Sequence, residues 1–262
     1  MILTLATRSL RTLVSNNGDG SLSLLDVPAY AIKQFELRGL NVPSSMLAGW
    51  SLDDLDRLRD SADKAGCPCL VLIEDQPLAF TADDKTERAA ADRVQRLAAA
   101  ASRLGCNALA VRCEAPDTDE ALDETATQLK AVMPVMERSE LNLLIAPHDG
   151  LTASPQRLTD LLKRIGGFRV GSLPDFAHAA ASGDLVQALR MLAPYAGAVH
   201  ATVEAFDQQG EHKSYDLAEG VAAIQSVGFA NTLAIDYVGS GDPVANIEKA
   251  RKILTDAIET KP

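Results

Sequence analysis

One unit of strand, helix and strand is readable in residues 141–176, which run LNLLIAPHDGLTASPQRLTDLLKRIGGFRVGSLPDF. The apolar runs Leu141–Ile145 and Arg169–Leu173 are typical of strands buried on both faces of a parallel sheet. Between them, Ser154 followed by Pro155 marks the start of a helix. The segment therefore predicts two parallel strands joined by a helical crossover.

The same pattern extends in both directions along the chain. Eight buried-strand runs occur about 33 residues apart, with helical patterns between them: Ile2–Ala6, Lys33–Leu37, Cys69–Ile73, Ala108–Arg112, Leu141–Ile145, Arg169–Leu173, Ala198–Ala201 and Leu233–Tyr237. Ser51 and Asp54 have the spacing of a capping box at one helix start, and Pro134 is expected to kink or end the helix in 118–137. Eight such units with right-handed crossovers predict one α/β domain over residues 1–262, a (β/α)8 TIM barrel.

An open, doubly wound sheet is the alternative fold. It would require a glycine-rich turn after the first strand, where this chain reads Thr7-Arg8-Ser9-Leu10. The missing glycines favour the closed barrel.

Composition and charge exclude several classes of protein. The 262 residues are 47% hydrophobic, and no apolar run approaches the roughly 20 residues that a bilayer span requires. The net charge of -11 repels a phosphate backbone, so neither a nucleic acid nor a membrane is an expected partner. The first 20 residues lack the pattern of an export signal, which predicts a cytoplasmic protein. In that compartment the four cysteines are expected to be reduced and buried: Cys67, Cys69, Cys106 and Cys113.

Ionisable residues follow the predicted strands, where barrel enzymes place their reacting groups. We expect one cleft lined by Glu36, Glu74, Arg112, His148, Asp175, His200 and Asp236. Carboxylates and imidazoles in one polar cleft indicate either a divalent-metal site or metal-free acid–base catalysis. Structural roles compete with this interpretation: Asp175 also fits a helix cap, His178 fits a packing position on an alanine-rich stretch, and residues 74–75 and 149–150 fit solvated turns. Asp236 lies between apolar strand residues and therefore needs a partner.

Two long segments carry a family resemblance. Residues 141–176 and residues 197–243, GAVHATVEAFDQQGEHKSYDLAEGVAAIQSVGFANTLAIDYVGSGDP, resemble the fifth to eighth strands of the xylose isomerase-like barrels, the sugar phosphate isomerase/epimerase family. Residues 33–39, KQFELRG, and 87–111, ERAAADRVQRLAAAASRLGCNALAV, also fit. The resemblance thus covers nearly the whole chain and implies the same barrel fold.

The resemblance also implies a metal site, from which this chain departs. Family members usually hold one divalent ion through a glutamate, an aspartate, a histidine and a glutamate at the ends of strands five to eight. Asp175 and His200 match the middle two ligands, whereas Asp236 replaces the last glutamate and Ala146 the first. Alanine has no donor atom, so Mn²⁺, Mg²⁺ or Zn²⁺ is expected to bind weakly or not at all, with His148 as a substitute ligand.

The function implied by the resemblance is isomerase- or epimerase-like chemistry on a small sugar or sugar acid. The candidate catalytic residues are His200, Asp236 and Glu74, and the candidate substrate-binding residues are Glu36, Arg38, Arg112, His148 and His178. In a metal-free version, His200 or Asp236 is the base and Arg112 or Arg38 binds an anionic substrate. A non-catalytic sugar-binding or subunit-type relative is the alternative. The expected partners are a small carbohydrate and, as in many barrels of this family, further copies of the chain.

Overall fold

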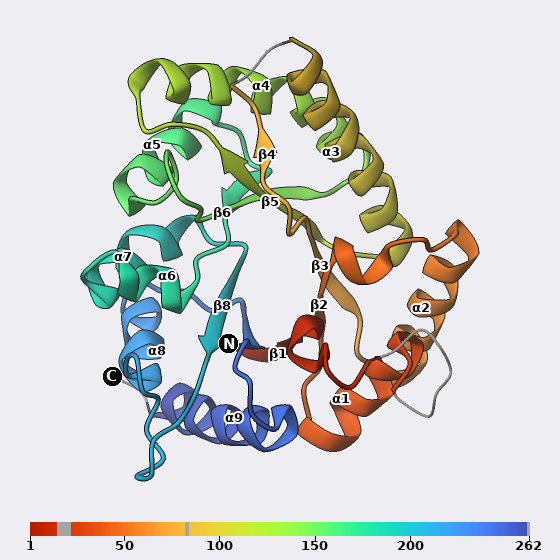
Figure 1. The fold of residues 1–262 in the computed structure, drawn as a ribbon, viewed down its shortest axis with the longest axis vertical. Helices are drawn as coiled ribbons and strands as arrows, with labels where there is room; N and C mark the ends of the chain where they lie inside the picture. Colours follow the sequence, from red (N-terminus) through yellow and green to blue (C-terminus); the bar gives the residue numbers. More distant parts are fainter. Residues whose placement is uncertain (15–21, 82–83, 261–262) are drawn as a thin grey trace.

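A ring of parallel strands surrounded by helices forms the protein (Figure 1). The computed structural model describes residues 1–14, 22–81 and 84–260. Eight strands follow one another around the ring in the order β7-β6-β5-β3-β2-β1-β9-β8. Their bounds are β1 Ile2–Ala6, β2 Leu40–Pro43, β3 Cys69–Ile73, β5 Ala108–Glu114, β6 Asn142–Ala146, β7 Val170–Ser172, β8 Ala198–Val203 and β9 Thr232–Tyr237, and a short β4, Leu78–Ala79, pairs with β5.

The ring closes between β7 and β8. Backbone hydrogen bonds from Gly197 N to Ser172 O (3.1 Å) and from His200 N to Pro174 O (2.9 Å) join the two strands. On the opposite side, Leu5 of β1 is in register with both Leu40 of β2 and Ile235 of β9. The predicted (β/α)8 barrel is therefore confirmed, and the carboxyl ends of all eight strands meet at one mouth.

Helices cover the outside of the ring. Their bounds are α1 Val27–Phe35, α2 Leu52–Ala65, α3 Asp84–Leu104, α4 Asp119–Arg138, α5 Pro155–Ile165, α6 Phe176–Ala181, α7 Leu185–Leu192, α8 Leu217–Ser226 and α9 Pro243–Glu259, with 3₁₀ turns η1 Thr7–Leu10, η2 Leu24–Asp26, η3 Ser44–Leu47 and η4 Ala193–Tyr195. α4 continues through Pro134 to Arg138, so the proline does not end this helix. The predicted capping box is confirmed, because the Ser51 and Asp54 side chains each bond the other's backbone N–H.

Replacing Ser51 by alanine is expected to lower the free energy of unfolding by about 1 kcal/mol, because one backbone N–H of the first helical turn loses its acceptor. Urea denaturation followed by circular dichroism measures the change. Ser102→Ala is the matched control, since Ser102 is an exposed residue inside α3 that caps nothing. Equal stabilities of the two variants would contradict a stabilising role for the cap.

The second strand is not where the sequence pattern placed it. Residues Lys33–Phe35 form the last turn of α1, and the predicted strand Lys33–Leu37 is wrong. Pro28 lies in the first turn of α1, and Glu36 ends the helix in a left-handed conformation with φ of 56°. The strand instead begins at Leu40, after a chain reversal that the short apolar run did not indicate.

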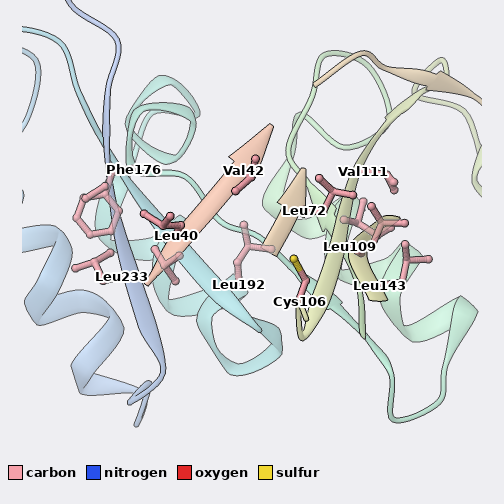
Figure 2. Close-up of a cluster of buried hydrophobic side chains, with 14 of the residues drawn as sticks. Leu40, Val42, Leu72, Cys106, Leu109, Val111, Leu143, Phe176, Leu192 and Leu233 are labelled. Carbon is pink, nitrogen blue, oxygen red and sulfur yellow. The ribbon is translucent and has the colours of Figure 1, made fainter. Parts of the chain in front are cut away.

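The buried side chains form two layers. A large outer layer fills the space between strands and helices, and Figure 2 shows part of it, including Leu72, Leu109 and Phe176. A smaller cluster inside the ring has eight members, of which four are alanines, among them Ala110, Ala146 and Ala198. Ala146 of this cluster lies at the floor of the barrel mouth, beside Ile73 and Leu173. The four cysteines are buried and unpaired, as predicted.

No helix within the described ranges is both long and apolar enough to cross a membrane.

Candidate functional site

A cavity of about 530 Å³ opens at the mouth of the barrel. Its polar lining residues come from the ends of seven strands: Arg8, Asn41, Asp75, Arg112, His148, Asp149, Asp175, His178, His200, Thr202 and Glu204. Predicted site residues Arg112, His148, Asp175, His178 and His200 thus lie around one space. Asp236 lies beneath this layer, fully buried and in contact with the cavity wall through Arg8 and His200.

Glu36 and Arg38 lie at the other end of the barrel, so their predicted place at the mouth is wrong. They line a separate surface pocket with residues such as Met1 and Arg251, at the amino end of β1. The Glu36 carboxylate accepts a 2.6 Å hydrogen bond from Arg251 Nη1. The cause is the misplaced second strand: both residues precede β2 instead of following it.

Glu74 lies outside the cavity, in the wall of a neighbouring groove. Its buried carboxylate accepts hydrogen bonds from Ser44 Oγ (2.9 Å), Gln76 N (3.0 Å) and Arg93 Nε (2.5 Å). These contacts satisfy both oxygens and connect β3 to α3. The arrangement gives Glu74 a structural role and corrects its expected place in the cleft.

Glu74→Gln is therefore expected to reduce stability by about 1 kcal/mol, because a charge-assisted bond to Arg93 becomes a neutral one. Ligand binding at the mouth should stay unchanged. The matched variant Asp75→Asn alters the adjacent carboxyl, which lines the cavity. Thermal unfolding and ligand titration of both variants separate the two roles, and a binding defect confined to Glu74→Gln would contradict this assignment.

The Asp236 carboxylate is held by two side chains. Arg8 binds the carboxylate in a bidentate manner: Nε donates to Oδ1 at 2.6 Å, and Nη2 donates to Oδ2. His200 Nδ1 lies 3.1 Å from Oδ2, and His200 Nε2 lies 3.0 Å from the Asn41 side-chain nitrogen. With its Nδ1–H donated to Asp236, the imidazole keeps its lone pair on Nε2, where it accepts from the Asn41 amide.

Charge states in this network follow from burial and pairing. Burial alone favours the neutral form of Asp236, but hydrogen bonds and charges from His200 and Arg8 outweigh it and hold the pKa of the carboxyl well below its ordinary value. Burial also opposes the charge on Arg8, yet Asp236 raises the Arg8 pKa. Arg112 has its pKa lowered, first by burial and then by the nearby Arg8 charge. Asp236 is thus an ionised partner and a weak base.

Asp175 caps a helix, as one of the two interpretations predicted. Its Oδ1 accepts a 3.0 Å hydrogen bond from the backbone N–H of His178 at the start of α6, and its Oδ2 accepts from Thr202 Oγ1. The carboxylate is half-buried and lines the cavity, so the cap and the site share one residue.

The two histidines at the rim differ. The ring of His178 contacts the Ala153 carbonyl through Nε2 at 3.1 Å. The backbone N–H of His148 donates to Thr152 Oγ1 at 3.0 Å, and within the described part of the chain its half-buried ring has no hydrogen-bonding partner. The His148 ring is therefore free to contact a ligand in the cavity.

Sequence reasoning missed Arg8, Asn41 and Thr202. Arg8 follows β1 by two residues, so a search of all eight strand ends would have found it. Asn41 is in β2, which the pattern misplaced. Its Oδ1 is buried without a hydrogen-bond partner in the described structure.

A family model described as xylose isomerase-like TIM barrel matches residues 29–257, and the chain belongs to this family. No curated protein matches it.

Solved structures share the fold at low sequence identity. An L-ribulose 3-epimerase has a TM-score of 0.81 at 16% identity, covering 99% of this chain and 94% of its own. The IOLI protein with a bound zinc atom has a TM-score of 0.76 at 14% identity, covering 98% of both chains. A D-psicose 3-epimerase crystallised in the presence of D-fructose has a TM-score of 0.75 at 13% identity, covering 98% of this chain and 97% of its own.

The metal site implied by the family does not fit the contacts made here. Asp175, His200 and Asp236 have potential ligand atoms within 4.8 Å of one another. However, both Asp236 oxygens are bound by Arg8, and each ring nitrogen of His200 faces a partner. Ala146, which lines the cavity, adds no donor. As arranged, these residues form a hydrogen-bonded ion pair and not an open coordination site.

Proposed function

We propose that this protein binds a small sugar or sugar acid at the barrel mouth and transfers a proton in an isomerase- or epimerase-type reaction. The observation that carries the proposal is the cavity of about 530 Å³ in which fixed cations face acid–base side chains. Its volume lies in the range of small-molecule sites. The L-ribulose 3-epimerase and the D-psicose 3-epimerase that share this fold support the same reaction class for this barrel.

Recognition of the ligand rests on three groups in the cavity wall. Arg112 donates one hydrogen bond, from Nη1 to Asp75 O at 3.2 Å, and its other N–H groups are free within the described residues. Arg8 uses Nε and Nη2 on Asp236 and keeps Nη1 for a ligand oxygen. The unsatisfied Asn41 Oδ1 accepts a hydrogen bond from a hydroxyl of the sugar, which offsets the cost of burying that oxygen without a partner.

His200 is the proposed base. Asp236 positions its ring, so Nε2 can take a proton from the carbon next to the substrate carbonyl when the substrate displaces the Asn41 contact. The C–H electron pair forms a C=C bond to the carbonyl carbon while the C=O π pair moves to oxygen, and the resulting oxyanion pairs with the guanidinium groups of Arg8 and Arg112. Return of a proton from His200 or His148 completes isomerisation or epimerisation.

The test is proton exchange in D₂O. The protein is incubated with the neutral ketose D-fructose or the keto acid 5-keto-D-gluconate, and ¹H NMR follows loss of the C–H signals next to the carbonyl. We expect exchange with one of these probes and a drop of about 100-fold or more in His200→Gln. His212→Gln is the matched control, because His212 bonds Glu204 N and Tyr215 O in a loop and does not line the cavity.

Saturable binding of the probes without exchange would overturn the proton transfer and favour the non-catalytic, sugar-binding alternative. Neither binding nor exchange would overturn the assignment of these ligands. Equal losses in His200→Gln and His212→Gln would remove the specific role of His200.

A further inference from the structure

We propose that the guanidinium of Arg8 is the resident cation of this site and takes the place of the divalent ion that the family resemblance implies. The side chain reaches from η1, directly after β1, across to the carboxyl end of the neighbouring strand β9. There it binds both oxygens of Asp236. Asp236 occupies the place on β9, the eighth strand of the barrel, where the family resemblance implies a metal-binding glutamate. The inference concerns what neutralises the site and does not depend on the proposed reaction.

The geometry of the pair leaves no room for an ion at the same carboxylate. The Asp236 side chain is fully buried, so its oxygens can be approached only from the cavity side, where Arg8 and His200 already lie. A metal ion binds carboxylate oxygen at about 2.0–2.2 Å, closer than any of these hydrogen-bond donors. An ion at Asp236 would therefore have to displace Arg8.

The charges around the cavity lead to the same result. The guanidinium groups of Arg8 and Arg112 already supply positive charge among the buried or half-buried carboxylates of Asp75, Asp175 and Asp236. A divalent ion in this space would face two guanidinium groups. It would also lack the carboxylate that family members have at the end of the fifth barrel strand, because this position at the end of β6 is Ala146. Ala146, which supplies no ligand, and Arg8, which supplies the positive charge, thus belong to one metal-free arrangement.

An arginine cation has a consequence for ligand choice. A guanidinium binds planar oxygen groups such as carboxylates through paired N–H donors, and it stays charged without recruiting an ion from solution. Arg8 lines the cavity, and Asp236 engages its Nε and Nη2 but not its Nη1. The site should bind its ligands equally well in the presence and absence of a chelator.

Metal titration of the full-length protein tests the inference. Protein treated with EDTA and dialysed is titrated with MnCl₂ by calorimetry, and with ZnCl₂ in a second series. Wild type and Arg8→Lys, which keeps the positive charge, are expected to show no saturable binding. Arg8→Ala frees Asp236 and is expected to show saturable Mn²⁺ binding, at least about tenfold tighter than the weakest affinity that the titration detects. Adding Ala146→Glu to Arg8→Ala supplies the missing ligand and should gain about another tenfold or more.

Two controls keep the test decisive. Arg164→Ala removes an exposed ion pair with Asp123 and should leave metal binding as in wild type. If Arg8→Ala fails to fold, Ala146→Glu alone decides, because it should gain no Mn²⁺ affinity while Arg8 is present. Micromolar Mn²⁺ binding by wild type, an unchanged affinity in folded Arg8→Ala, or a tenfold gain in Ala146→Glu alone would each overturn the inference.

Discussion

Replacing Arg8 by methionine is expected to lower the free energy of unfolding at pH 7 by about 3 kcal/mol, the lower part of the range for breaking a buried ion pair. Asp236 would remain ionised and buried with only His200 beside it. We expect the lower end of this free-energy range because 34% of the Arg8 side chain is exposed and water screens the pair from one side. Methionine preserves most of the apolar volume, so lost packing contributes little.

The effect of Arg8→Met should depend on pH in a defined direction. The native pKa of Asp236 lies below its ordinary value of 3.8, so the stability from its pairing is fully present above that value and is lost as the pH falls through the native pKa. Loss of Arg8 leaves burial less opposed and raises the pKa of Asp236 in the variant above its wild-type value. The stability difference between wild type and Arg8→Met should therefore be largest at pH 7 and narrow in acid, as the pH falls through the Asp236 pKa of the variant. Urea denaturation at pH 7, 5 and 3.5 measures it.

Two further variants separate the ion pair from general damage to the barrel. Arg164→Met, which breaks an exposed pair, should cost less than about 1 kcal/mol. The double variant Arg8→Met with Asp236→Leu removes both charges and should be more stable than Arg8→Met alone. A single variant as stable as wild type, or a stability difference that widens in acid, would contradict the paired, ionised state of Asp236.

Buried strands were the part of the fold that local sequence predicted well. A strand covered on both faces needs a nearly continuous apolar run, and seven of the eight expected runs overlap an observed strand, for example Cys69–Ile73 in full. The exception, Lys33–Leu37, is short enough to suit either a helix end or a strand. Its true state depends on the packing of α1 against its neighbours, which no local pattern contains.

The site shows the same division between local and long-range information. Strand ends indicated Arg112, His148, Asp175 and His200 because a parallel barrel brings those ends together. The requirement that Asp236 have a partner was also readable from its apolar neighbours. The identity of that partner was not, because Arg8 is 228 residues away and meets Asp236 only when β1 pairs with β9.

Arg112 is the residue whose loss should most affect an anionic ligand. Arg112 extends from β5 opposite Ala146 of β6. Its guanidinium therefore borders the space that a carboxylate at position 146 would fill. Within the described residues, the Arg112 side chain makes one hydrogen bond, the 3.2 Å contact from Nη1 to Asp75 O. Burial and the neighbouring Arg8 disfavour its charge, which lowers its pKa, and a ligand carboxylate would relieve that cost.

Arg112→Gln is therefore expected to weaken binding of 5-keto-D-gluconate by about 10- to 100-fold, the equivalent of one charge-assisted hydrogen bond of about 1.5–3 kcal/mol. Binding of D-fructose, which has no carboxylate, should fall by less than about threefold, since glutamine still offers a neutral donor. Calorimetric titration of both ligands at two salt concentrations measures the difference. The matched control is Arg138→Gln at the exposed end of α4, away from the cavity, which should change neither affinity. Equal losses for the two ligands in Arg112→Gln would mean that Arg112 shapes the cavity wall and does not select for charge.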